Sequence, residues 1–285
     1  MLDSTITSLI DGQAIKTYYH TYTSSDGVEL CFQRIGSGKP LLLIHGLGSS
    51  SLDWEFQYAA LGEQYELIIP DLRGFGRSTQ AYFDMPNPSA SMNLFASDMQ
   101  DLMRHLNINS CPVMGYSMGG PVAFQLALDN LEHQTAFRPE SLIIVNSLAS
   151  FKIDSLKKMY LIGLRKLFTR IFSMPKLANI LGNKLFPDNP ALAAEMAARN
   201  GKNKKQPYTA SLNALLKWQA GPKLKDINQR TIFITADGDY SPPSEKQKSV
   251  DIMQNASLQI IANSLHGTPM DQPEAFNQAV LDFLA

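Results

Sequence analysis

Residues 111–121, CPVMGYSMGGP, decide the fold of this chain because they join a short apolar run to a helical segment through a turn at Ser117. The apolar half of the stretch is typical of a buried strand, and the residues from Gly119 onward are compatible with a helix. Gly115 and Gly119 flank the serine, and a turn this sharp leaves no room for a side chain at either position. Pro121 falls in the first helical turn, where its missing N–H costs nothing. The stretch predicts a strand, a tight turn that presents Ser117, and a helix.

Similar apolar runs recur along the chain and alternate with helix-compatible segments. The runs lie at 40–46, 66–71, 111–117, 141–147, 231–237 and 257–264, and the helical segments lie at 51–61, 93–107, 119–131, 244–255 and 272–284. Strands that are apolar on both faces belong to a parallel sheet covered by helices. Residues 16–23 and 28–35 alternate instead, and Gly27 lies between them, which predicts an antiparallel hairpin. We therefore expect an α/β fold with a mostly parallel central sheet and an antiparallel N-terminal hairpin.

One long interval breaks this alternation. Roughly eighty residues separate the run that ends at Ser147 from the run that starts at Thr231, far more than a crossover connection needs. The interval predicts a core formed by residues 1–148 and 227–285, with a mostly helical insertion, or cap, at 149–226.

The predicted insertion is basic. Residues 152–226 hold fifteen Lys and Arg and four Asp and Glu, a net charge of +11, which leaves −12 for the rest of the chain and −1 in total. Its first helical segment has an apolar stripe of Leu156, Tyr160, Leu164, Leu167 and Ile171, with Lys158, Arg165, Lys166 and Arg170 toward the opposite side. We expect the stripe to pack against the core and the cations to be solvated. The alternative is that the insertion attracts anionic substrates or makes a weak contact with anionic lipid surfaces.

Ser117 needs a general base, because a serine hydroxyl is a poor nucleophile near neutral pH, and the base needs an acid to orient it. His266 follows the last apolar run, in the loop before the C-terminal helix, and is the base that we predict. The other four histidines fall in the hairpin, at a strand end or at helix ends, where structural roles are expected: His20, His45, His105 and His133.

The acid is expected directly after the apolar run that ends at Ala236, where Asp237 and Asp239 lie two residues apart. Only one of the two can occupy a reverse turn aimed at His266. The order of Ser117, an aspartate and His266, each in the loop after a strand, resembles the α/β-hydrolase superfamily, in its serine esterase and lipase-like branch with a helical cap. In that superfamily the acid lies a few residues beyond the strand, in an Asp-x-Asp stretch followed by a proline. The resemblance implies Asp239, with Asp237 as the alternative.

Two further segments carry the resemblance. Residues 43–48, LIHGLG, look like the HGxG segment of the family, which implies an oxyanion hole formed by the backbone N–H groups of Leu47 and Met118. His45 is then a positioning residue and not a second base. Residues 71–78, DLRGFGRS, look like a loop of the family that we interpret as structural. The resemblance covers the predicted core, and the insertion matches only in its placement.

The resemblance implies a serine hydrolase that cleaves a carboxylic ester of a small or medium acyl group through an acyl-enzyme intermediate. Ser117 argues against the haloalkane dehalogenases and epoxide hydrolases of the superfamily, which carry an aspartate at this turn. A carbon–carbon bond hydrolase, a lactonase, an aminopeptidase or a perhydrolase would use the same three residues. An alternative of another class is a ligand-binding protein that has lost catalysis. The expected partner is a small-molecule ester, and neither a cofactor nor a metal is expected.

The composition of the 285 residues excludes several other classes. Hydrophobic residues make up 44% and charged residues 18%, which is typical of a globular protein and not of a disordered one. Two cysteines, Cys31 and Cys111, are too few for a disulfide framework. The N-terminus lacks the pattern of a secretory signal, and the apolar runs are far shorter than the ~20 residues that cross a bilayer. We expect a cytoplasmic protein. We expect no nucleic-acid partner, on the basis of the implied fold and active-site residues.

Overall fold

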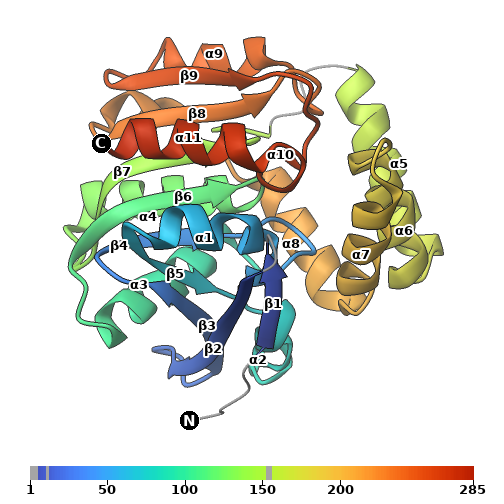
Figure 1. The fold of residues 1–285 in the computed structure, drawn as a ribbon, viewed down its shortest axis with the longest axis horizontal. Coiled ribbons are helices and arrows are strands. Elements are labelled where there is room, and N and C mark those ends of the chain that lie inside the picture. The colour runs from blue at the N-terminus through green and yellow to red at the C-terminus, as the bar shows by residue number, and fades with distance from the viewer. Residues whose placement is uncertain (1–5, 11–12, 152–155) are drawn as a thin grey trace.

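The computed structural model describes residues 6–10, 13–151 and 156–285. Within this part of the chain, nine strands form one sheet in the order β1-β2-β3-β5-β4-β6-β7-β8-β9 (Figure 1). The strands are β1 (Ile6–Ile10), β2 (Gln13–Thr23), β3 (Glu29–Gly36), β4 (Lys39–Ile44), β5 (Tyr65–Pro70), β6 (Ser110–Tyr116), β7 (Arg138–Val145), β8 (Arg230–Ala236) and β9 (Ala256–Ile261). Neighbouring strands are parallel from β5 to β9 and antiparallel from β1 to β5. The predicted sheet is confirmed.

The antiparallel part of the sheet is larger than the sequence predicts. The expected hairpin is β2 paired with β3, and its turn is closed by hydrogen bonds between Ser24 and Val28 and between Gly27 and Ser24. β3 also pairs with β5, and β1 pairs with the outer edge of β2. The sequence of β1, ITSLI, does not alternate strictly between apolar and polar residues, so periodicity does not reveal this strand.

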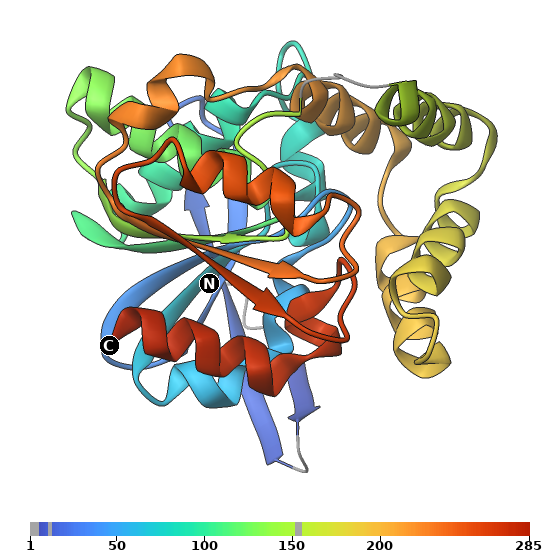
Figure 2. The ribbon, with the colours of Figure 1, turned by 90° about the horizontal axis from the view of Figure 1, so that it is seen from above.

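Helices cover both faces of the sheet (Figure 2). On one face lie α1 (Tyr58–Gly62) and α11 (Pro273–Leu284), and on the other lie α3 (Met92–His105), α4 (Gly119–His133) and α9 (Pro243–Val250). The segment predicted as one helix at 51–61 is divided into a 3₁₀ helix and α1. The remaining short helices of the core are η1 (Ser51–Gln57), η2 (Gly76–Ser78), α2 (Thr79–Phe83) and α10 (Thr268–Asp271).

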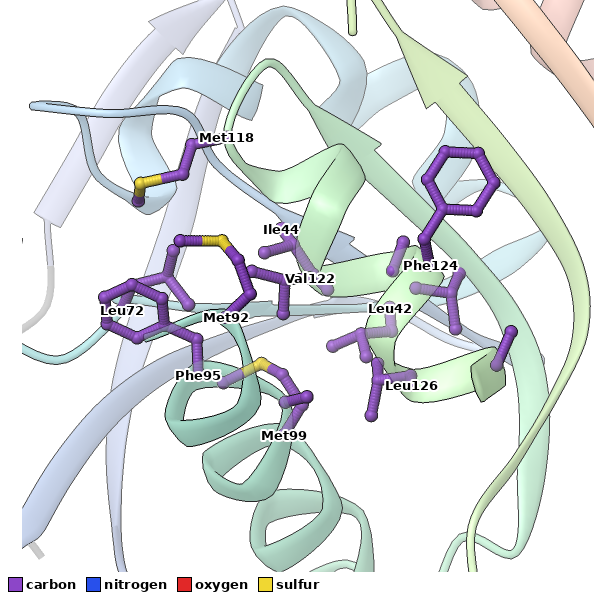
Figure 3. Close-up of a cluster of buried hydrophobic side chains, with 14 of the residues drawn as sticks. Leu42, Ile44, Leu72, Met92, Phe95, Met99, Met118, Val122, Phe124 and Leu126 are labelled. Atoms are coloured by element: carbon purple, nitrogen blue, oxygen red, sulfur yellow. The ribbon is translucent and has the colours of Figure 1, made fainter. Parts of the chain in front are cut away.

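The core explains why the central strands are continuously apolar. Successive side chains of a strand point to opposite faces, and here both faces are covered. In β4, Leu42 and Ile44 belong to the cluster that includes Met99 of α3, whereas Leu41 and Leu43 belong to the cluster on the other face. Figure 3 shows part of the first cluster, between α3 and α4. Burying one leucine side chain contributes about 1.5–3 kcal/mol, so alternate residues of each strand stabilise both layers.

The loop at residues 71–78 ties several parts of this scaffold together. The buried Arg73 pairs with Asp98 of α3 at 2.6 Å and with Asp26 of the hairpin turn at 2.8 Å. Asp71 accepts hydrogen bonds from the backbone N–H groups of Ser51 and Arg77, at 2.7 and 2.8 Å. These contacts connect the hairpin, α3 and η1, in agreement with the structural interpretation of this loop.

The insertion between β7 and β8 is helical, as predicted. It stands beside the sheet in both views (Figures 1 and 2) and consists of α5 (Leu156–Ile171), α6 (Met174–Leu185), α7 (Pro190–Asn200), α8 (Lys205–Lys217) and η3 (Gly221–Asp226). Its two ends lie side by side, because Ala220 N–H donates to the Ala149 carbonyl at 2.9 Å and Ser150 forms an isolated bridge with Gln219. The division of the chain into two domains with these boundaries stays a prediction.

The orientation of α5 differs from the sequence expectation. Leu156 is 79% exposed and Tyr160 is 67% exposed, and Leu167 and Ile171 are exposed as well. The expectation that this stripe packs against the core is wrong. The inner side of α5 is formed by other residues: Leu161 and Arg165 line a cavity, described below, and Phe168 packs against the core cluster. Contact of this helix with anionic lipid stays a prediction.

Ion pairs connect the basic insertion to the acidic core. Their partners are Lys158 with Glu245, Arg199 with Glu55, and Lys223 with Glu132. Among the residues that the structure describes, no helix combines the length and the apolar character needed to cross a membrane. The cellular compartment stays a prediction.

Candidate active site

Ser117 occupies a strained turn between β6 and α4. Its φ of +52° lies in the left-handed region, which residues other than glycine rarely adopt. Such a conformation persists where neighbouring groups hold the backbone. Here the Ser117 N–H donates to the Val145 carbonyl at 2.8 Å, and the Ser117 carbonyl accepts from Ser147 Oγ at 2.6 Å. A Cβ on either Gly115 or Gly119 would lie 2.2 Å from a backbone oxygen, so the turn requires both glycines.

A chain of hydrogen bonds joins Ser117, His266 and Asp239. His266 Nε2 lies 2.9 Å from Ser117 Oγ, and His266 Nδ1 lies 2.5 Å from Asp239 Oδ1. The three residues follow β6, β9 and β8, whose carboxyl ends meet at the same edge of the parallel sheet. With its Nδ1 proton directed at the carboxylate, the neutral ring presents the lone pair of Nε2 to the serine hydroxyl.

Asp237, the alternative acid, is used elsewhere. Its carboxylate accepts the backbone N–H groups of Asn263 at 3.0 Å and Ser264 at 3.1 Å. The hydrogen bonds from Ser264 and Asn263 hold the pKa of Asp237 below its usual value. Asp237 thus holds the start of the loop that carries His266 in place. Asp239, and not Asp237, contacts the histidine ring.

The ring and the backbone of His266 are both held in place. The Tyr240 ring stacks on the imidazole, with centroids 4.5 Å apart and an interplanar angle of 24°. The Asn146 side chain donates to the His266 carbonyl at 2.7 Å and accepts the Ala236 N–H at 2.9 Å, so it connects the His266 loop to β8. A base held in this way needs little reorganisation before it accepts a proton.

Lys246 of α9 is a buried partner of Asp239 that sequence reasoning missed. Its Nζ lies 2.5 Å from Asp239 Oδ2, and it also donates to Ser241 Oγ at 2.6 Å. Burial by itself would raise the pKa of Asp239, but His266 and Lys246 outweigh it and hold that pKa below its usual value. The carboxylate is therefore ionised at neutral pH. A lysine in a polar helix gives no sequence signal of burial.

Lys246→Met is expected to destabilise the protein by about 3–5 kcal/mol near neutral pH, because it leaves a buried carboxylate with one cation fewer. The lowered pKa of Asp239 contributes stability above about pH 4, the usual aspartate range, and that stability is lost as the pH falls through the lower folded-state pKa. The difference in the free energy of unfolding between Lys246→Met and wild type should therefore become smaller in acid. Guanidinium unfolding at pH 7, and again at pH 4 and below, measures this difference. The exposed Lys248→Met, on the same helix, is the control, and an undiminished difference in acid would contradict the pairing.

The predicted oxyanion donors border the serine. Leu47 lines the same cavity as Ser117, and Met118 follows Ser117 directly, at the start of α4. In the described part of the chain, neither backbone N–H donates to another protein group. The Met118 side chain is buried in the core cluster (Figure 3), which leaves its backbone at the turn. Two unpaired N–H groups beside a serine are available to a developing oxyanion.

His45 holds the segment that carries Leu47. Its Nε2 accepts the Leu72 N–H at 2.9 Å, and its Nδ1 lies 2.8 Å from the Gly46 carbonyl. An Nε2 that accepts leaves the proton on Nδ1, which donates to Gly46. Burial lowers the pKa of His45, which favours this neutral form. The geometry agrees with a positioning role.

Ser117 and His266 open into a cavity of about 330 Å³ that the insertion covers. Its wall is mainly apolar, with contributions from α5, α6 and α8 that include Leu161, Met174, Leu177, Leu181 and Leu212. Among the described residues, the charged ones in the wall are Asp53, Lys158, Arg165 and Glu245.

Known proteins resemble this chain in sequence or in fold. A "Putative carbamate hydrolase RutD" from Caulobacter vibrioides is 28% identical over 268 residues, which cover 88% of this chain and 91% of that protein. An uncharacterized protein from Mycobacterium tuberculosis is 39% identical over 101 residues, but the match spans only 28% of its length and 35% of this chain. A thermophilic esterase from Thermogutta terrifontis superposes with a TM-score of 0.78 at 25% identity and covers 95% of this chain and 98% of that chain.

The family assignment rests on a match along most of the chain. Residues 39–273 fit the family profile described as the alpha/beta hydrolase fold. This range starts at β4 and includes Ser117, Asp239 and His266 together with the whole insertion. The chain belongs to the alpha/beta hydrolase fold family.

Proposed function

We propose that this protein is a serine hydrolase that cleaves carboxylic esters of small or medium acyl groups through an acyl-enzyme intermediate. The observation that carries the proposal is His266, whose two ring nitrogens lie 2.9 Å from Ser117 Oγ and 2.5 Å from Asp239 Oδ1. This arrangement is the one that activates a serine for acyl transfer. The resemblance to an esterase supports an ester substrate, and the mainly apolar wall of the cavity supports an acyl chain that contacts apolar side chains.

In the first half of the reaction, Ser117 Oγ attacks the ester carbonyl while its proton passes to His266 Nε2. Asp239 stabilises the imidazolium cation. The N–H groups of Leu47 and Met118 receive the oxyanion, and each contributes up to about 3 kcal/mol. The carbon–oxygen bond to the alcohol then breaks, and His266 returns its proton to the leaving alkoxide. The acyl group remains on Ser117 Oγ.

In the second half, a water molecule takes the place of the alcohol. His266 accepts one proton from the water as its oxygen attacks the acyl carbonyl, and the same two N–H groups receive the second oxyanion. When this intermediate collapses, the bond to Ser117 Oγ breaks and His266 returns the proton to that oxygen. The carboxylic acid leaves and the enzyme is restored.

A panel of p-nitrophenyl esters of rising chain length tests the proposal. We expect turnover to be highest for short or medium acyl chains and to fall for long ones, because the covered cavity measures about 330 Å³. A β-diketone, a lactone, a prolyl amide and a carbamate are measured beside the esters. The carbamate is the second candidate, because the Caulobacter relative carries that name. The ester assignment is wrong if any of these four compounds is turned over with a higher kcat/KM than every ester.

A further inference from the structure

The cavity contains a guanidinium group that has no acidic partner among the described residues. Arg165, on the inner side of α5, lines the cavity and donates a hydrogen bond to the Tyr208 hydroxyl. Its Nε is buried and has no hydrogen-bond partner. Among the described residues no carboxylate lies within ion-pair distance of Arg165. Lys158 lies on the same side of α5 but differs from Arg165, because it pairs with Glu245 at 3.1 Å.

The other charged residues of the cavity do not compensate Arg165. Glu245 is engaged by Lys158. Asp53 is 5% exposed, and burial raises its pKa to about 7, so this carboxyl is partly protonated at neutral pH. Asp239 is engaged by His266 and Lys246. The positive charge of Arg165 therefore faces a mainly apolar wall.

Arg165 lines the cavity into which Ser117 and His266 open. Its partner Tyr208 lies over the segment that carries Leu47, because a Cβ on Gly48 would be 2.7 Å from the Tyr208 ring. On the other side, Tyr240 stacks on His266. Tyr240 lines the same cavity as Arg165, Ser117 and His266. A ligand that acylates Ser117 therefore occupies the cavity into which Arg165 faces.

Arg165 is half-buried, and its buried Nε is a donor without an acceptor. A buried donor that lacks a partner costs free energy, and an anionic ligand would offset that cost. The guanidinium group is planar and presents paired N–H donors that match a carboxylate.

We propose that Arg165, held by Tyr208, is a specificity-determining residue that binds a free carboxylate on the substrate. The preferred substrates are then esters that carry a second, ionised carboxyl group, such as half-esters of dicarboxylic acids. The inference rests on the proposed ester hydrolysis, and it adds the chemical class of the substrate. It also gives a reason for a cation on the inner side of a helix whose apolar stripe faces outward.

Matched pairs of esters test this inference. The p-nitrophenyl half-esters of succinate, glutarate and adipate are compared with the butanoate, pentanoate and hexanoate esters, which lack the carboxylate. We expect wild type to prefer the anionic ester for at least one pair. Arg165→Gln should lower kcat/KM for that ester by about 10- to 100-fold, the value of a hydrogen bond to a charged group, and leave the neutral ester within about twofold. Arg165→Lys should recover part of the loss.

Lys166→Gln is the matched control, because it removes the same charge from the adjacent, exposed position of α5. Lys166→Gln should leave kcat/KM unchanged for both kinds of ester. If it lowers kcat/KM for the anionic ester as much as Arg165→Gln does, the effect is general electrostatic attraction and the inference is overturned. The inference is also wrong if wild type prefers the neutral ester in every pair, or if Arg165→Gln slows both kinds equally. Thermal melting checks that each variant is folded.

Direct binding separates this inference from the proposed function. If wild type hydrolyses no ester of either kind, the proposed function fails, and calorimetry with glutarate still tests the carboxylate site. Weaker glutarate binding to Arg165→Gln than to wild type and Lys166→Gln would support the site. Equal binding to all three proteins, or no binding to wild type, would overturn it.

Discussion

Ser117→Ala is expected to lower ester turnover by about 10⁴- to 10⁶-fold, because it removes the nucleophile and with it the covalent intermediate. The same variant should lose all labelling by a fluorophosphonate, which reacts with an activated serine. The fold should remain, since the backbone bonds that hold the turn are made by the Ser117 N–H and carbonyl and not by its hydroxyl. Steady-state kinetics, labelling followed by mass spectrometry, and thermal melting measure the three effects.

The matched control for this variant is Ser49→Ala. Ser49 is a second buried serine that lines the same cavity, but His266 Nε2 is directed at Ser117. We expect Ser49→Ala to keep fluorophosphonate labelling. Wild type that is folded and is not labelled would favour a ligand-binding protein on this fold over an enzyme. Labelling that persists in Ser117→Ala would place the nucleophile elsewhere.

His266→Ala should reduce ester turnover by a similar factor, about 10⁴- to 10⁶-fold, because the hydroxyl of Ser117 then has no base within hydrogen-bond distance. The loss should be in kcat, since the apolar wall that binds the acyl group is untouched. Asp239 keeps its ion pair with Lys246 in this variant, so the buried carboxylate retains a partner and the protein should remain folded. Kinetics with the best p-nitrophenyl ester and a thermal melt measure both effects.

His133→Ala serves as the control for His266→Ala. His133 lies at the end of α4 with 69% of its side chain exposed, far from the turn at Ser117 along that helix. Its removal should leave kcat and KM at the wild-type values. Wild-type turnover in His266→Ala would remove His266 from the mechanism and, with it, the reason for assigning Asp239 a role.

The sequence predicts those parts of the site that depend on local geometry. The turn at Ser117 follows from two glycines between a strand and a helix, and the structure shows that a side chain at either glycine would strike backbone oxygen. The choice between Asp237 and Asp239 is different. Both lie in the turn after β8, and only the loop after β9 distinguishes them, because its backbone N–H groups bind Asp237 and its histidine contacts Asp239.

Two other features depend on contacts that no local pattern contains. The sequence predicts that Lys246 is a solvated helix residue. In the structure it is buried, because it pairs with Asp239 and donates a hydrogen bond to Ser241, both in the preceding turn. The sequence of α5 predicts a helix with a stripe to bury, but the stripe is exposed because a different face of the helix lines the cavity and contacts the core. Helical spacing shows which side chains share a face and does not show what lies opposite that face.

The sequence by itself determined the alternation of strands and helices, the turn at Ser117, the order of the candidate catalytic residues and the position of a helical insertion. The alternation follows from hydrophobic periodicity, the turn from backbone sterics, and the insertion from the length of the interval between two strands. The order of the catalytic residues is what the resemblance to the α/β-hydrolase superfamily implies. Only the tertiary structure decided the strand order, the burial of Lys246 and the direction in which α5 presents Arg165. The resemblance implied Asp239 as the acid, and the structure adds the contacts that bring this carboxylate, and not Asp237, to His266. These depend on which residues, distant in the chain, meet at the edge of the sheet, and packing between separate elements decides that.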